Sequence, residues 1–235
     1  MSRRVEVSTW PVTSDELMAA QEALAAGPRP PLWRPSPSMV VAGCFACLPR
    51  GESGAGAAGD PVWAAAAAYR GRRCVGRAAV TGTASGPYVP GLLALRIGAP
   101  LESAVRALPE TPDVVLVDAT GYDHPRRAGL AFHLGAVLDL PTVGVTHRTL
   151  LATGDWPSDV RAATSPLVLD GEVVGYWLRT RAGRRPVAVH AGWRTAPETA
   201  VQVVLTVAQH RTPAPLREAR RVARVSRAST GHRLW

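Results

Sequence analysis

Short apolar runs alternate with polar or Gly- and Pro-containing stretches through the first half of the chain, a pattern that predicts strands joined by turns. Before them, Thr13 and Glu16 have the spacing of a capping box and predict a helix that runs to about Ala26. Strands are then expected over residues 39–48, 62–70 and 73–81, and a tight turn at Gly71 joins the last two. Together these three strands predict an antiparallel meander.

The second half of the chain alternates between strands and helices. Helices are expected over residues 99–108, 125–138, 196–209 and 216–227, and strands over 114–118, 142–145 and 186–190. Two buried strands on either side of one helix predict a parallel pair with a crossover helix. Asp170-Gly171 predicts a hairpin with a tight type I′ turn. The expected fold class is therefore α/β, a mixed sheet of about six to eight strands flanked by helices.

A chain of 235 residues fits a single domain over residues 1–235. Within it we expect an N-terminal helix and connector over 1–37, a core over 38–209, and a basic C-terminal helix and tail over 210–235. No apolar stretch is long enough for a membrane span, and the N-terminus lacks the apolar core of a signal peptide. Three cysteines are too few for a secreted disulfide scaffold, so we expect a cytoplasmic protein.

The charge balance gives the first indication of a partner. Twenty-seven basic residues, all of them arginine, oppose 18 acidic residues and give a net charge of +9. A genome with a strong arginine bias explains why arginine replaces lysine, but it does not explain the excess of basic over acidic residues. A basic protein favours polyanions, because each neutralised phosphate releases counterions. DNA or RNA is therefore the expected partner.

Two segments raise the question of a metal. Cys44 and Cys47 form a C-x-x-C pair, but residues three apart on a strand point to opposite faces, so we expect neither zinc nor redox chemistry from them. Asp118 ends the apolar strand at 114–117 and precedes a small loop, which is a position typical of a catalytic carboxylate. One carboxylate rarely holds a divalent cation alone, so the rest of the chain has to supply further ligands.

The order of five motifs resembles the endonuclease V family, which acts at deoxyinosine in DNA and at inosine in RNA. The motifs are AGCF, PYVPG, LVDATGYDHPRRAGLAFHLG, PTVGVTHR and VHAGWR. They lie within residues 40–194, and the run from His124 to Gly135 is long and specific. The resemblance implies a ribonuclease H-like fold, in agreement with the mixed sheet expected above. It also implies metal-assisted phosphodiester hydrolysis.

The same resemblance shows where this chain departs from the family's metal site. The family's central Asp is retained as Asp118, but the first-strand Asp, the Glu and the His of the family fall at Phe45, Ile97 and Trp193. The family's Lys falls at His147. Magnesium prefers oxygen ligands, so three apolar replacements predict a degenerate site and no cofactor. Magnesium or manganese would be needed only if an active site persisted.

Asp118 is then expected to be a relic of the site. A bare buried carboxylate is costly, so we predict that it accepts a hydrogen bond from a neighbour such as His124 or an arginine. The intruding rings of Phe45 and Trp193 are expected to fill the volume of the ion. Glu102 and Asp123 are the nearest other acids in sequence, but neither stands where a ligand was lost.

The positions that handle the substrate in the family are better retained. The Pro-flanked aromatic of the family separates strands, and the altered base turns into a small pocket that Ala119 is expected to narrow. The expected nucleic-acid-binding residues are Pro87, Tyr88, Val89, Pro90, Gly91, Gly121, His124, Arg126, Arg127 and Arg194. A rigid aromatic can stack on a base at a small entropic cost. A Pro-rich surface turn and a structural role for His124 stay open as alternatives.

Three functions follow from these residues. The first is a nucleic-acid-binding protein of endonuclease V type, for inosine or distorted strands, in which metal-dependent cleavage is lost or strongly impaired. The second is an active enzyme in which Glu102 or His147 completes a weak site. The third is a protein-interaction module on the same fold. The first function predicts binding without cutting, the second predicts metal-dependent nicking, and the third predicts neither.

Overall fold

The computed structural model describes residues 10–51 and 54–231 and places one eight-stranded mixed sheet at its centre. The strand order is β3-β2-β1-β4-β5-β8-β7-β6. The strands are β1 (Val40–Cys47), β2 (Pro61–Arg70), β3 (Arg73–Thr83), β4 (Val114–Val117), β5 (Thr142–Thr146), β6 (Thr164–Leu169), β7 (Glu172–Leu178) and β8 (Val187–Ala191). Residues 1–9, 52–53 and 232–235, which include the end of the expected C-terminal tail, lie outside the described residues.

Pairing directions in the sheet agree with the sequence pattern. Strands β1 to β3 form the expected antiparallel meander, and β1, β4 and β5 are parallel neighbours. Strands β5, β8, β7 and β6 continue the sheet with antiparallel pairs. Asp170 and Gly171 both have positive φ between β6 and β7, as the predicted hairpin requires.

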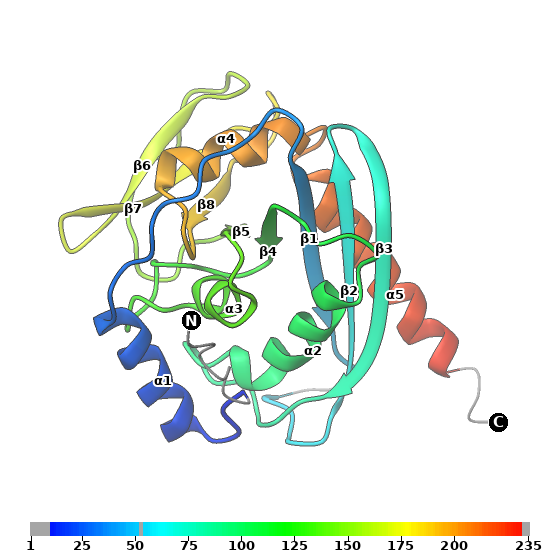
Figure 1. Ribbon diagram of the computed structural model, residues 1–235. Helices are drawn as coiled ribbons and strands as arrows, with labels where there is room; N and C mark the ends of the chain where they lie inside the picture. The colour runs from blue at the N-terminus through cyan, green and yellow to red at the C-terminus, as the bar shows by residue number, and fades with distance from the viewer. Residues whose placement is uncertain (1–9, 52–53, 232–235) are drawn as a thin grey trace, which may run out of the picture.

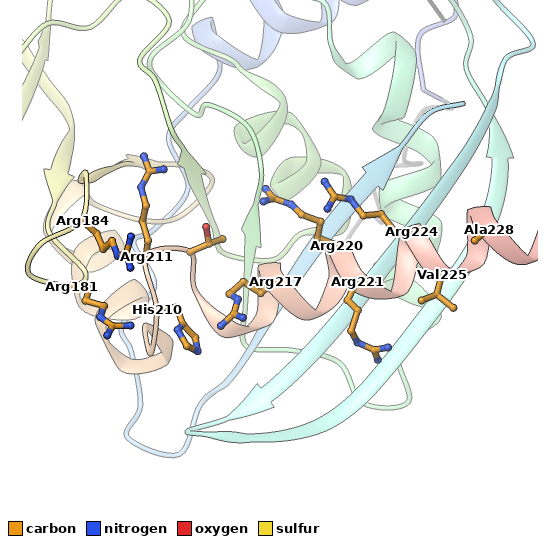
Figure 2. Close-up of a pocket in the computed structure, with 11 residues that line it drawn as sticks. Arg181, Arg184, His210, Arg211, Arg217, Arg220, Arg221, Arg224, Val225 and Ala228 are labelled. Carbon is orange, nitrogen blue, oxygen red and sulfur yellow. The ribbon is translucent and has the colours of Figure 1, made fainter. Parts of the chain in front are cut away.

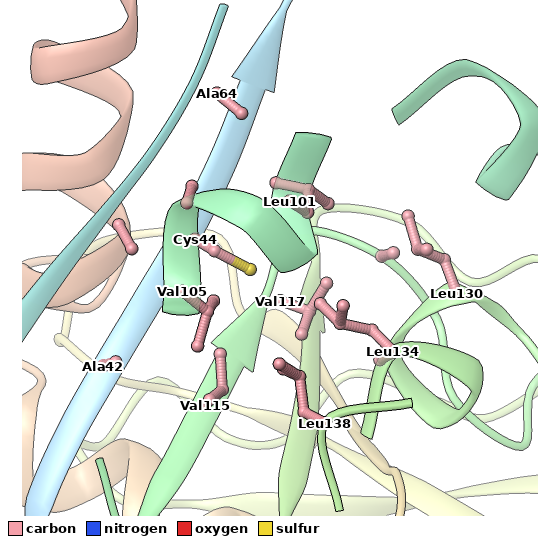
Figure 3. Packing of buried hydrophobic residues seen from close by; sticks show 14 of the residues in the cluster. Ala42, Cys44, Ala64, Leu101, Val105, Val115, Val117, Leu130, Leu134 and Leu138 are labelled. Carbon is pink, nitrogen blue, oxygen red and sulfur yellow. The ribbon is translucent and has the colours of Figure 1, made fainter. Parts of the chain in front are cut away.

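Helices cover both faces of the sheet (Figure 1). They are α1 (Ser14–Ala26), α2 (Ala94–Arg106), α3 (Leu130–Leu138), α4 (Pro197–Val207) and α5 (Ala214–Gly231). Helices α2 and α3 pack on one face, where Cys44 and Val117 lie within a core of apolar side chains (Figure 3). Helices α4 and α5 cover the other face, where Leu116 and Leu216 belong to a second core. Both faces are thus apolar, as is typical of a sheet between two helical layers.

A close approach brings helix α5 onto strand β1. Gly43 faces this helix, and a Cβ atom at that position would lie only 2.5 Å from the backbone nitrogen of Leu216. The missing side chain therefore lets α5 lie directly against β1. The arginines of this helix consequently reach the ends of the central strands.

Two helix boundaries differ from the sequence prediction. Helix α2 begins at Ala94, five residues before the expected start, and continues through Gly98 and Pro100, two residues that usually interrupt helices. Helix α3 begins at Leu130 and not at residue 125, because Arg127 adopts a left-handed conformation with φ of 54°. The other elements agree within a few residues. Within the described chain, every helix is too short or too polar to cross a membrane.

Candidate functional site

The ends of strands β1 and β4 bring two of the expected positions together. The parallel register pairs Cys44 with Val117, so Phe45 and Asp118 follow as the next residues of the two strands. Phe45 joins a small apolar cluster with Ala223 of helix α5. Alternation along a strand puts Phe45 and Asp118 on the face that α5 covers, opposite Cys44 and Val117.

Arg220 of helix α5 contacts both residues. Its Nη2 donates a hydrogen bond to Oδ2 of Asp118 at 3.0 Å, and its guanidinium carbon lies 4.9 Å from the centroid of the Phe45 ring. The two charged side chains remain 28% (Asp118) and 25% (Arg220) exposed. The expectation that an arginine partners Asp118 is therefore confirmed. Phe45 adds a cation–π contact to this pair.

The donor set at this edge does not fit a magnesium or manganese ion. Such ions need several oxygen ligands, and the described residues contain no group of three or more His, Cys, Asp or Glu side chains that could hold a metal. One oxygen of Asp118 is already bound by Arg220, and the neighbouring strand offers the ring of Phe45. A guanidinium thus supplies the positive charge beside this carboxylate.

His147 lies at the same end of the sheet. It follows strand β5, and its side chain is exposed. Partial burial lowers the pKa of His147, and the nearby cations Arg211 and Arg220 lower it further, while Asp118 opposes this shift. A neutral imidazole beside two guanidinium groups carries no positive charge, so His147 cannot replace the lysine that the family resemblance implies at this position.

The structure separates Trp193 from Asp118, so the expectation that its ring fills the volume of an ion is wrong. Trp193 follows strand β8, and its backbone nitrogen donates to Oγ1 of Thr142 at the start of β5. Asp118 follows the end of β4. Because β4 runs parallel to β5, Asp118 lies toward the end of β5 and away from its start. The Trp193 ring instead packs edge-on against Phe132, with the centroids 5.2 Å apart.

Ile97 has a structural environment of its own. It lies on helix α2 and packs against the core that includes Cys44, on the face of the sheet opposite helix α5. Phe45 belongs to the cluster under α5. Phe45 and Ile97 therefore belong to separate clusters.

A small cavity of about 190 Å³ opens beside Asp118. Its lining includes Tyr88, Asp118, Ala119, Thr120, His124 and Leu130. Tyr88 is 50% exposed and Val89 36% exposed, so the tip of the 87–90 segment is presented to solvent at the rim. Ala119 lines the cavity as expected, and an exposed aromatic beside a small cavity is an arrangement that suits an unpaired base.

His124 is held by two hydrogen bonds and acts as a structural residue. Its Nε2 donates to the carbonyl oxygen of Gly91 at 2.8 Å, and its Nδ1 accepts from the backbone nitrogen of Arg126 at 3.2 Å. Gln21 donates to the same carbonyl and accepts from Nε of Arg126. This network ties helix α1, the Tyr88 segment and the loop after β4 together. Sequence analysis missed Gln21, since a glutamine within a helix carries no signal of this contact.

Three other expected binding residues have structural contacts. Gly121 does not line the cavity: a Cβ there would collide with the carbonyl oxygen of Ala191, so it is a packing glycine. Arg127 binds the carbonyl oxygen of Leu169 and the carboxylate of Asp170, and so fixes the β6–β7 hairpin. Arg194 lies beside Trp193 and lines a different cavity from Tyr88.

The two spare acids are also engaged in the framework. Asp123 is fully buried and accepts hydrogen bonds from the backbone nitrogens of Leu150, Leu151 and Ala152, each at 2.7 Å. Glu102 accepts from Trp10 and from Arg106, both at 2.7 Å. Neither acid is available to complete a metal site at Asp118.

The two cysteines of the C-x-x-C pair lie on opposite faces of strand β1, as the alternation of a strand predicts. Cys44 packs in the core under α2, whereas Cys47 packs in the cluster under α5. The pair therefore points to opposite faces of β1, and both thiols are free. Burial raises the pKa of both thiols, so neither is an activated nucleophile.

Known proteins of one family resemble this chain over most of its length. The model of the Endonuclease V family matches residues 40–221. Endonuclease V of Nocardia farcinica is 39% identical over 232 residues, which cover 95% of this chain and 97% of the relative. A crystal structure of Endonuclease V from Streptomyces avermitilis superposes with a TM-score of 0.82 at 32% identity, covering 94% and 96% of the two chains. Endonuclease V of Ciona intestinalis, solved in complex with DNA containing an inosine, shares the fold at 20% identity, with a TM-score of 0.76 and coverage of 92% and 98%.

Proposed function

This chain belongs to the endonuclease V family, and from that premise we propose that it binds nucleic acid at inosine or at distorted strands while its metal-dependent cleavage is lost or strongly impaired. The proposal combines two sets of residues. The elements around the small cavity are those that would receive a base. The elements at Asp118 lack the oxygen donors that cleavage would need.

One observation carries the loss of cleavage. Arg220 binds Asp118 at 3.0 Å and stacks on Phe45, so a fixed guanidinium compensates the single remaining carboxylate. A divalent cation would have to displace this guanidinium and would find one carboxylate where several are needed. Arg220 and a divalent cation would compete for Asp118, and Arg220 is favoured because it is covalently part of the chain.

Retention of binding is supported by the Tyr88 segment and by charge. Tyr88 is half exposed at the rim of the cavity that Asp118, Ala119 and Thr120 line. The relative from Ciona intestinalis was solved with inosine-containing DNA. A net charge of +9 favours association with a polyanion before any specific contact forms.

The decisive experiment reads binding and cleavage on the same oligonucleotides. Single-stranded and duplex DNA with one deoxyinosine, and matched strands without it, are mixed with the protein at low salt, in EDTA or in manganese. Fluorescence anisotropy measures binding, and a denaturing gel measures nicking. We expect binding that does not depend on the metal, a preference for the inosine strands, and no nicking.

Two outcomes would overturn the proposal. Manganese-dependent nicking on the 3′ side of the lesion that the Asp118→Ala variant abolishes would establish an active enzyme. Absence of binding at low salt, where phosphate contacts are strongest, would instead favour a protein-interaction module.

A further inference from the structure

A broad groove lined with arginines runs along helix α5, beyond the small cavity. Its volume is about 720 Å³, and Figure 2 shows the residues that line it. Its lining is formed by Arg181, Arg184, His210, Arg211, Thr212, Arg217, Arg220, Arg221, Arg224, Val225 and Ala228. We call it the arginine groove. The residues come from α5, from the segment that precedes it, and from the loop after β7.

Within the part of the chain that the structure describes, no carboxylate lines the arginine groove. Two of its arginines reach carboxylates outside the lining, Arg220 at Asp118 and Arg221 at Glu218. Within the described chain, four groove arginines have no side-chain hydrogen bond or ion pair: Arg181, Arg184, Arg217 and Arg224. Clustered cations repel one another, so an anionic ligand would stabilise this arrangement.

Arg217, Arg220 and Arg224 follow a spacing of three and four residues, which places them on adjoining parts of one helix face. Figure 2 shows Arg220 and Arg224 projecting together from α5 toward the ends of the strands.

The arginine groove and the small cavity meet at one ion pair. Arg220 lines the groove, and Asp118, to which it is bound, lines the cavity with Tyr88. Helix α5 contributes lining residues from Arg217 to Ala228, a length of roughly 16 Å at the rise of an α-helix. This length accommodates several consecutive phosphates of a strand that leaves the cavity.

We propose that the arginine groove binds the phosphodiester backbone of a single strand whose neighbouring base occupies the small cavity. This inference rests on the proposed nucleic-acid binding and adds the path of the strand. Guanidinium groups suit this ligand because they form paired hydrogen bonds with phosphate oxygens. An acidic protein partner fits less well, because Val225 is the one large apolar side chain in the lining and protein interfaces have an apolar centre.

The test is the salt dependence of binding. Arg217→Ala with Arg224→Ala removes two exposed, unpaired groove cations, and a single-stranded deoxyinosine oligonucleotide is titrated by fluorescence anisotropy over a range of NaCl concentrations. Each phosphate contact with a single strand contributes about 0.7 to the slope of log K against log salt concentration. We therefore expect the double variant to lose about 1.4 from the magnitude of this slope.

Arg70→Ala with Arg106→Ala is the matched control. It removes the same charge from side chains that are both 52% exposed and lie outside the groove, so the slope should stay that of the wild type. Thermal unfolding confirms that each variant is folded. An equal change of slope in both double variants would show a mere effect of net charge and overturn the inference.

The remaining outcomes separate this inference from the proposed function. If the wild type binds the oligonucleotide and the groove variant keeps its slope, the strand takes another path and only the groove inference fails. If the wild type does not bind at low salt, both fail. Competition by poly-glutamate as strong as that by an oligonucleotide of equal charge would assign the groove to acidic proteins and overturn the phosphodiester proposal.

Discussion

Arg220 reaches from helix α5 to the end of strand β4, where its Nη2 lies 3.0 Å from Oδ2 of Asp118. Clustered carboxylates at a metal site repel one another, and the bound cation compensates that repulsion. At Asp118, a side chain of the same polypeptide provides a compensating charge. Phe45, Asp118 and Arg220 therefore form one set at the edge of the sheet, in which the ring of Phe45 lies against the guanidinium and Asp118 accepts its hydrogen bond.

Manganese binding tests this set directly. We expect no saturable manganese binding by the wild type or by Arg220→Ala, because a single carboxylate is too few ligands. Arg220→Ala combined with Phe45→Asp places two carboxylates on neighbouring strands, and weak saturable binding should then appear in electron paramagnetic resonance titrations. Phe45→Asn in the same background is the control without the second charge. Tight binding by the wild type would contradict the role of Arg220.

Phe45 should also contribute to stability. Replacement by Ala removes its contacts with the cluster under α5 and the cation–π contact with Arg220, which lies 4.9 Å from the ring centroid. For a partly buried ring we expect a loss of about 2 kcal/mol in the free energy of unfolding. Urea denaturation measures this loss. Phe45→Leu, which keeps most of the packing but loses the ring, should lose roughly 1 kcal/mol. A Phe45→Leu variant as stable as the wild type would exclude a cation–π contribution.

The fold was predictable from local patterns, but the contacts at the site were not. The capping box at Thr13 and the Asp170-Gly171 turn act within a few residues, so their effects can be deduced from the sequence. The start of helix α2 was missed because Gly98 and Pro100 suggest a break that the surrounding packing overrides. Arg220 lies 102 residues from Asp118. No local pattern distinguishes it from its neighbouring arginines.

The position of Trp193 illustrates the same limit. A motif match aligns residues along the chain, and it suggested that Trp193 lies beside Asp118. The register of β4, β5 and β8 instead puts the two residues at opposite ends of the sheet. Strand direction is a property of the whole sheet, so this error could be corrected only by the structure.

Tyr88 should affect binding without affecting stability. Its side chain is half exposed at the rim of the small cavity. Tyr88→Ala is expected to weaken binding of single-stranded deoxyinosine oligonucleotides by about 1–3 kcal/mol, the contribution typical of one stacked base. The thermal midpoint should change little, and Tyr88→Phe should bind like the wild type. Unchanged affinity of Tyr88→Ala would exclude stacking at this position.

Buried His133 predicts a loss of stability in mild acid. Burial lowers its pKa from 6.5 to about 4, so the unfolded state takes up a proton at a higher pH than the folded state does. The free energy of unfolding should therefore fall as the pH decreases from 6.5 toward 4, with His133 contributing about 1.4 kcal/mol per pH unit. Urea denaturation at several pH values should show a shallower fall for His133→Phe, whose ring can keep the stacking on Trp10. Parallel curves for the two proteins would contradict this assignment.

Among the acids of the framework, Asp123 should be the one whose substitution destabilises the fold most. Its buried carboxylate accepts three backbone hydrogen bonds from residues 150–152 and lies 3.8 Å from Nδ1 of His190. Asp123→Asn replaces one acceptor oxygen with an amide nitrogen, whose N–H groups would face backbone N–H groups. We therefore expect a loss of about 3 kcal/mol in the free energy of unfolding. Asp155→Asn, at an exposed position, should cost less than about 0.5 kcal/mol. Hydrogen exchange of the amides at 150–152 should accelerate only in the first variant, and slow exchange there would show that another contact holds this loop.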